Sequence, residues 1–205
     1  MGANIPFSAA GKEVPMGREF ELKYRATPEI ITAIRETYEN FLEISMETAY
    51  YDTPDGALGD LHWTLRRRYE NGRSVCTVKI PLPDGSRGEW ETECNTIEAA
   101  IPELCKLGAP HHLEILTEYG VMRTCAAKFT RLAAALDLGS AEVELALDEG
   151  ILIGGKRELP FAEVEVELKS GSETAAIAFA QMLAKEYGLV PEPKSKVQRA
   201  LELRK

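Results

Sequence analysis

Residues 19–23 read Glu19-Phe20-Glu21-Leu22-Lys23, a strict alternation of charged and apolar side chains. Because neighbouring side chains of a β-strand leave on opposite faces, this period predicts a strand. One face carries Phe20 and Leu22, and the other carries Glu19, Glu21 and Lys23. Two carboxylates beside an ammonium suit a site that binds a metal cation together with an anion. A half-buried strand with a solvated polar face would show the same alternation, so this strand alone does not separate the two interpretations.

The same pattern recurs along the chain. An apolar face opposes a charged face in five further segments, at 64–68, 77–80, 87–93, 142–147 and 163–168. We count about eight antiparallel strands with helices between them, which makes the fold class α+β. A sheet closed into a barrel with its charged faces inward would have an interior holding both signs of charge. Such an interior would suit a polyanion bridged by metal ions.

Glu19-x-Glu21-x-Lys23 resembles the ExExK signature of the CYTH superfamily, the triphosphate tunnel metalloenzymes. Further matches follow in order: Tyr50-Tyr51-Asp52-Thr53-Pro54, Leu65-Arg66-Arg67-Arg68, Thr77-Val78-Lys79, Arg87-Gly88-Glu89, Glu163-Val164-Glu165-Val166-Glu167 and Lys196. ExExK alone is a weak motif, whereas the ordered set, covering about Arg18 to Leu203, is specific. The resemblance implies a closed eight-stranded antiparallel β-barrel, a tunnel with peripheral helices, that hydrolyses a triphosphate. It would form a single domain over 18–205, after a flexible tail over 1–17.

Seven cationic side chains are candidates for binding the phosphates: Lys23, Arg66, Arg68, Lys79, Arg87, Arg131 and Lys196. Arginine suits phosphate because its guanidinium forks onto two oxygens, and lysine supplies a compact charge. Strand parity turns Arg66 and Arg68 to one face and Arg67 to the other. Arg131 and Lys196 depend mainly on their positions in the family pattern. The alternative is that these are ordinary surface cations.

The metal candidates are Glu19, Glu21, Glu163 and Glu165, because Mg²⁺ and Mn²⁺ prefer oxygen ligands shared between carboxylates and substrate phosphates. Either ion is the expected cofactor, and Glu19, Glu21 and Lys23 are the expected catalytic residues. A second acidic group would pair with the cations of the interior: Glu89, Glu91, Glu142, Glu144 and Asp148. Simple salt bridging is the equal alternative for that second group.

Composition limits the partners. The chain has 205 residues and a net charge of −9, which disfavours a general nucleic-acid binder. It shows no apolar run that could span a bilayer and no signal-peptide pattern, so we expect a cytoplasmic protein with no membrane partner. The four scattered cysteines argue against a zinc site and against disulfides. The expected partner is a small-molecule polyanion, a triphosphate, and the expected state is a monomer or homodimer.

Two segments test the resemblance. Residues Met122–Leu136 are rich in alanine and could be a helix by propensity, but the family pattern makes them a long strand. Ser195-Lys196-Val197-Gln198 has the form of a capping box and predicts a final short helix. That helix should close one mouth of the barrel and bring Lys196 to the phosphates.

Inorganic triphosphate is the expected substrate, cleaved to pyrophosphate and phosphate. Class IV adenylate cyclases carry His-Phe shortly before ExExK, and this chain has nothing like it there. Thiamine triphosphatases place a tryptophan two residues before the first arginine of the pair, where this chain has Thr64. These enzymes, other nucleoside or organic triphosphatases, and a non-catalytic polyphosphate-binding module remain the alternatives. A pure anion binder would have little use for the metal carboxylates.

Overall fold

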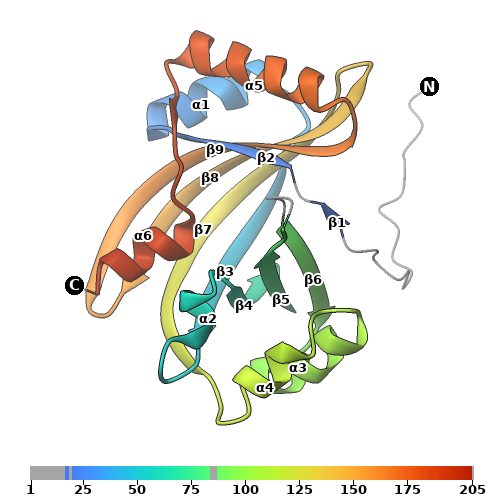
Figure 1. Cartoon of the computed structure of the whole chain (residues 1–205). Helices are drawn as coiled ribbons and strands as arrows, with labels where there is room; N and C mark the ends of the chain where they lie inside the picture. The colour runs from blue at the N-terminus through green and yellow to red at the C-terminus, as the bar shows by residue number, and fades with distance from the viewer. Residues whose placement is uncertain (1–16, 19, 84–86, 205) are drawn as a thin grey trace.

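The computed structural model describes residues 17–18, 20–83 and 87–204. Within them, an antiparallel ten-stranded sheet curls around a common interior, and helices pack against it (Figure 1). The strands are β1 Gly17–Arg18, β2 Glu21–Arg25, β3 Leu42–Asp52, β4 Thr64–Glu70, β5 Arg73–Pro81, β6 Arg87–Glu93, β7 Met122–Asp137, β8 Ala141–Gly154, β9 Arg157–Gly171 and β10 Val190–Pro191. The helices are α1 Pro28–Thr37, α2 Ala57–Asp60, α3 Ile97–Lys106, α4 His112–Leu116, α5 Glu173–Tyr187 and α6 Lys196–Glu202. The α+β class is confirmed; the predicted tail, apart from residue 17, and Glu19 lie outside the described residues.

The strand order is β1-β6-β5-β4-β3-β7-β8-β9-β2-β10, so among the described residues the hydrogen-bonded ladder is open rather than circular. The first two strands of the chain, β1 and β2, pair with β6 and β9, which lie near opposite ends of this order. The N-terminal segment therefore links the two edges that a closed barrel would join directly. The described chain has ten strands instead of the predicted eight because the first predicted strand is split and because β10 adds a short piece beside β2.

Two apolar clusters fix which face of each strand turns outward. The first packs α1 and α5 against β2, β8 and β9, around fully buried side chains such as Ile34, Leu145 and Leu183. The second packs α3 and α4 against β4, β5 and β6, and it contains Trp90, with Trp63 partly buried at its edge. Each such burial is worth about 1.5–3 kcal/mol. The side chains between the outward ones must then face the interior.

A third cluster lies at one end of the interior. Tyr50, Phe129 and Phe161, on β3, β7 and β9, pack there with Ala200 of α6. Helix α6 thus lies against interior side chains. The sequence predicts that this helix closes one mouth of the barrel. Its predicted capping box is confirmed, with Ser195 as the N-cap.

The alanine-rich segment forms β7, a strand of 16 residues, so the prediction from the family pattern is confirmed. The residues before β4 do not extend that strand toward Gly59. They form α2, because the Asp52 carboxylate accepts hydrogen bonds from the backbone N–H groups of Thr53, Leu58 and Gly59 at 2.8, 3.0 and 3.1 Å. Local bonds of this kind compete with a sheet ladder.

Helix α3 contains Pro102 and runs through it to Lys106. A proline removes one helical hydrogen bond. Ile97, Ile101 and Leu104 hold the helix in the second apolar cluster on both sides of that position. None of the helices in the described part of the chain is long and apolar enough to span a membrane.

Candidate functional site

Three carboxylates from β8 and β9 meet in the interior. Asp148 and Glu163 are fully buried, and Glu165 is 6% exposed. Strand parity turns Glu163 and Glu165 to the same face of β9, and Asp148 stands opposite Glu163 in the ladder between β8 and β9. One ligand atom of each carboxylate lies within 4.8 Å of the others. We call these residues the acidic triad.

Lys196 places its ammonium among the triad. Its Nζ lies 2.9 Å from Asp148 Oδ2 and 2.6 Å from Glu165 Oε1, and it also contacts Glu163 Oε2. The side chain is 9% exposed. A lysine in the first turn of a helix opposes the helix dipole. The three carboxylates supply the opposing charge, so the described structure already contains a partner for Lys196 other than phosphate.

Arg131 binds the triad from β7. Its Nε and Nη2 donate to the two oxygens of Asp148 at 2.7 and 2.8 Å, and Nη2 also donates to Glu165. This bidentate geometry follows from the register that places Arg131 opposite Asp148. The predicted strand over Met122–Leu136 therefore brings Arg131 into the interior.

Arg199 is a functional candidate that the sequence analysis missed. It donates to Glu163 Oε1, and its Nη1 lies 3.7 Å from Glu192 Oε2. Glu192 in turn lies 3.5 Å from Arg25 Nε. The signal was present in the sequence, because Arg199 follows Lys196 by three residues on one short helix and therefore shares its face.

The charges of the triad shift one another's pKa values. Burial raises the pKa of Glu163 above its usual value. Burial would do the same to Glu165, but Lys196 and Arg131 hold the pKa of that carboxyl well below its usual range. Burial would also lower the pKa of Lys196, yet the neighbouring carboxylates raise it above its usual range. Glu165 and Lys196 are therefore a stable ion pair at neutral pH.

A basic group lies on β4 and β5. Arg66 Nη2 and Lys79 Nζ both contact Glu89, at 3.4 and 3.3 Å. Arg68 is 8% exposed and donates from Nε to Thr48 Oγ1 at 3.1 Å. Burial, with the charges of Arg66 and Arg131, lowers the pKa of Arg68 to about 10. We call Arg66, Arg68 and Lys79 the basic group.

Arg67 faces away from this group. It donates to the Asn95 carbonyl at 2.7 Å, and its guanidinium lies 5.1 Å from the centre of the Tyr69 ring. Adjacent arginines of one strand therefore have different surroundings.

The remaining candidates lie around these two groups. In the ladder between β2 and β9, Glu21 stands opposite Glu167, and Lys23 stands opposite Glu165. Glu144 lies 3.8 Å from Arg131 and 3.7 Å from Lys169.

Three other candidates are not gathered at the triad. Glu142 accepts a hydrogen bond of 3.1 Å from Ser170. Arg87 is exposed at the start of β6, and Glu91 stands opposite Thr77 on β5. The predicted site residues therefore divide between the triad, the basic group and more exposed positions.

The donor set of the triad fits a hard divalent cation, because Mg²⁺ and Mn²⁺ prefer carboxylate oxygens gathered closely in space. The ammonium of Lys196 already lies among these oxygens. The triad thus binds a cation in this structure, and that cation belongs to the protein.

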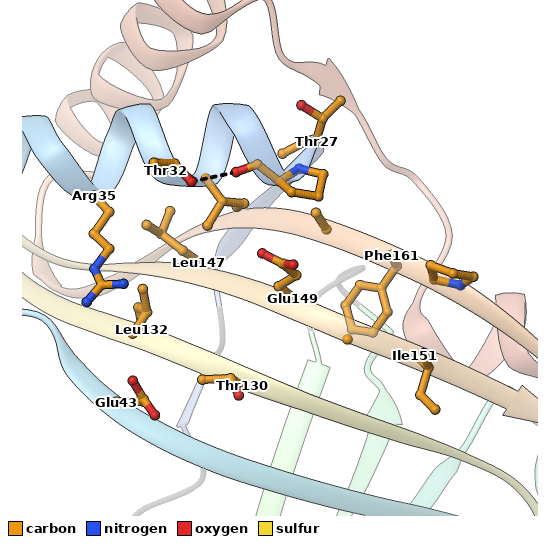
Figure 2. A pocket seen from close by; sticks show the side chains of 16 residues that line it. Thr27, Thr32, Arg35, Glu43, Thr130, Leu132, Leu147, Glu149, Ile151 and Phe161 are labelled. Atoms are coloured by element: carbon orange, nitrogen blue, oxygen red, sulfur yellow. Dashed lines mark hydrogen bonds between the residues drawn. The ribbon is translucent and has the colours of Figure 1, made fainter.

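A groove of about 580 Å³ lies elsewhere, between α1 and the outer face of the sheet (Figure 2). Leu132 and Leu147 form part of its floor, while Arg35, Glu43 and Glu149 are exposed. Among the residues that line it there is no cluster of buried charges comparable with the triad.

Comparisons with known proteins identify the family and support the fold. The sequence matches the CYTH domain over residues 17–201. An inorganic triphosphatase of Haemophilus influenzae is 27% identical over 191 residues, which are 90% of this chain and 54% of that protein. The chain thus spans about half the length of this curated relative.

Two solved structures share the fold. A protein of Pyrococcus horikoshii OT3 is 26% identical, with a TM-score of 0.63 over 91% of this chain and 99% of that one. A Hippeastrum protein, described as a putative adenylyl cyclase with a dominant triphosphatase activity, is 18% identical. Its TM-score is 0.63 over 91% of this chain and 96% of that one, a likeness that concerns the fold alone.

Proposed function

Because the chain belongs to the CYTH domain family, we propose that it hydrolyses inorganic triphosphate to pyrophosphate and phosphate with the help of a divalent cation. The observation that carries the proposal is the placement of the basic group and the acidic triad on one interior. Arg68 and Arg131 are close enough for the charge of Arg131 to lower the pKa of Arg68. Cations for the phosphates and carboxylates for a metal ion thus face the same space.

The basic group would bind the phosphates. Arg66 and Arg68 present guanidinium groups whose donors match the spacing of phosphate oxygens, and Lys79 adds a point charge. Lys23 lies on β2, opposite Glu165 of β9, and would add a further cation beside the triad. Such fixed positive groups stabilise the charge that spreads over the transferred phosphoryl group.

The carboxylates would hold the metal ion. Glu163 and Glu165 supply oxygens beside Asp148, and Glu21 lies on the neighbouring strand β2. Glu19, two positions earlier in the sequence, remains a proposed ligand. When bound, Mg²⁺ or Mn²⁺ would neutralise phosphate charge and polarise the phosphoryl oxygens. The relative from Haemophilus influenzae, named an inorganic triphosphatase, supports tripolyphosphate as the first substrate to test.

A phosphate-release assay tests the proposal. The full chain is incubated with tripolyphosphate, ATP, thiamine triphosphate or pyrophosphate, each with Mg²⁺, with Mn²⁺ or with a chelator. We expect the highest kcat/KM for tripolyphosphate and loss of activity with the chelator. Faster turnover of thiamine triphosphate or ATP would overturn the choice of substrate. Binding of tripolyphosphate without release of phosphate under any metal would overturn hydrolysis and leave a binding module.

A further inference from the structure

The charges around the acidic triad are balanced by the protein itself. The triad contributes three carboxylates, and Lys196, Arg131 and Arg199 contribute three cations in direct contact with them. Burying ionised groups is costly unless each is paired. The triad therefore does not require a metal ion for its own stability.

The ammonium of Lys196 and a divalent cation would need the same oxygens. Lys196 Nζ contacts one oxygen of each triad member, with Asp148 at 2.9 Å and Glu165 at 2.6 Å. A metal ion would be held by the same oxygens at about 2.0–2.2 Å. Two cations this close would repel each other strongly in a buried site. Both therefore cannot sit between the three carboxylates at once.

We propose that Lys196 is a built-in competitor for the divalent cation at the acidic triad, so that loading of the metal releases its ammonium. The inference rests on the proposed function only in taking the triad as a metal site. It makes Lys196 a residue with two positions. In one it neutralises the triad, and in the other it is free to face a phosphate.

The position of α6 does not depend on Lys196 alone. In the present position of its ammonium, Nζ also lies 5.3 and 5.5 Å from the ring centres of Phe129 and Phe161, whose faces attract a cation. Arg199 holds α6 by contacts with Glu163 and Glu192 that do not involve Lys196. The side chain can therefore withdraw while the helix stays attached.

Binding of Mn²⁺ to the full chain, without any phosphate compound, tests the inference. Free Mn²⁺ is measured by its electron paramagnetic resonance signal. Lys196→Met keeps most of the side-chain volume and removes the charge, so we expect it to bind Mn²⁺ at least about tenfold more tightly than the parent. Lys196→Arg keeps the charge and should bind no more tightly. Lys194→Met is the matched control, because Lys194 is exposed and pairs with Glu202, and it should leave the affinity unchanged.

Unchanged or weaker binding of Mn²⁺ by Lys196→Met would overturn the inference. A second measurement on the unaltered chain covers the case in which that variant does not fold. Acetylation of lysines, followed by mass spectrometry, should label Lys196 slowly without metal and faster with Mn²⁺, while Lys194 stays constant. Equal or slower labelling of Lys196 with Mn²⁺ would also overturn the inference. If both measurements succeed but tripolyphosphate is not hydrolysed, the proposed function fails and the competition stands.

Discussion

Arg67 and Arg68 are adjacent and chemically identical, but they face opposite sides of β4. Replacing each with methionine keeps a long unbranched side chain and removes the charge. We expect the two variants to have opposite effects. Arg68→Met should impair hydrolysis without lowering stability, whereas Arg67→Met should lower stability and spare hydrolysis.

The contacts of each arginine set the magnitudes. Burial, with Arg66 and Arg131, lowers the pKa of Arg68, so the folded chain disfavours its charge. Arg68 is protonated in both the folded and unfolded states at pH 7. The penalty is therefore fully present there and would fade only as pH rose above the folded pKa of about 10 toward the unfolded value. Removing the charge should leave the free energy of unfolding equal or higher. One lost charged hydrogen bond to phosphate, at about 1.5–3 kcal/mol, lowers kcat/KM by roughly 10- to 150-fold.

Arg67 faces the other side of β4, where its contacts stabilise the fold. Its bond to the Asn95 carbonyl and its contact with the Tyr69 ring should together stabilise the fold by about 1–2 kcal/mol. Its loss should change kcat/KM by less than about twofold, because it does not face the site. Urea unfolding at pH 7 and phosphate release from tripolyphosphate are measured on both variants and the parent.

Two results would refute this reasoning. If Arg67→Met loses as much kcat/KM as Arg68→Met, the two faces of β4 do not differ in function. If Arg68→Met unfolds at lower urea than the parent, the contacts of Arg68 with Thr48 and Glu70 outweigh the cost of burying its charge beside Arg66 and Arg131. Arg68→Lys then separates charge from geometry, since it restores the charge without the fork.

Three further predictions concern other parts of the molecule. Glu19→Gln and Glu21→Gln should each lower turnover of tripolyphosphate by about 100-fold or more, because each removes a carboxylate proposed to bind the metal ion. The melting temperature should stay nearly unchanged, because neither change alters core packing. Full activity of either variant in limiting Mg²⁺ would contradict the assignment of these residues as metal ligands. Burial raises the pKa of the Cys76 and Cys125 thiols to about 11. At pH 8 both thiols should therefore resist iodoacetamide in the native chain and react in urea. Rapid alkylation of either thiol in the native chain would argue against its burial. Asp52→Ala removes the acceptor of three backbone N–H groups. In urea titrations it should lower the free energy of unfolding by about 2–4 kcal/mol. A change below about 1 kcal/mol would mean that other contacts hold α2 in place.

The parts of the fold that sequence predicted best follow from the period of a strand. Alternation is a property of the backbone, so the opposite faces of Arg67 and Arg68 could be predicted without any tertiary information. The helix that begins at Lys196 was predictable for a similar reason, because its capping box is local. The alanine-rich strand β7 required the family pattern, since intrinsic propensity favours helix there.

Other features depend on contacts between distant residues. Lys196 and Glu165 are 31 positions apart, and no local rule states that a lysine will meet that carboxylate. The spacing of Arg199 from Lys196 was visible in the sequence, but its partner Glu163 lies on β9, 36 positions earlier, so no local pattern pairs the two. The open strand order also escaped prediction, because period 2 identifies strands but not which edges bond to each other. At Asp52, side-chain bonds to the backbone form α2 ahead of β4, and such local bonds depend on geometry that the strand pattern does not contain.

The interior has two halves with different electrostatic surroundings, and the pKa values of two arginines shift in opposite directions in them. Neighbouring carboxylates raise the pKa of Arg131, whereas burial and neighbouring arginines lower that of Arg68. The half around β8 and β9 is thus already neutralised, in part by Lys196, while Arg68 lacks full compensation. A polyanion that approaches Arg68 would supply the negative charge that this guanidinium lacks. It would thereby gain binding free energy that a surface with fully paired charges could not supply. A metal ion that displaced Lys196 would add one more free cation to the same interior. Metal and triphosphate should therefore bind cooperatively, each increasing the affinity for the other.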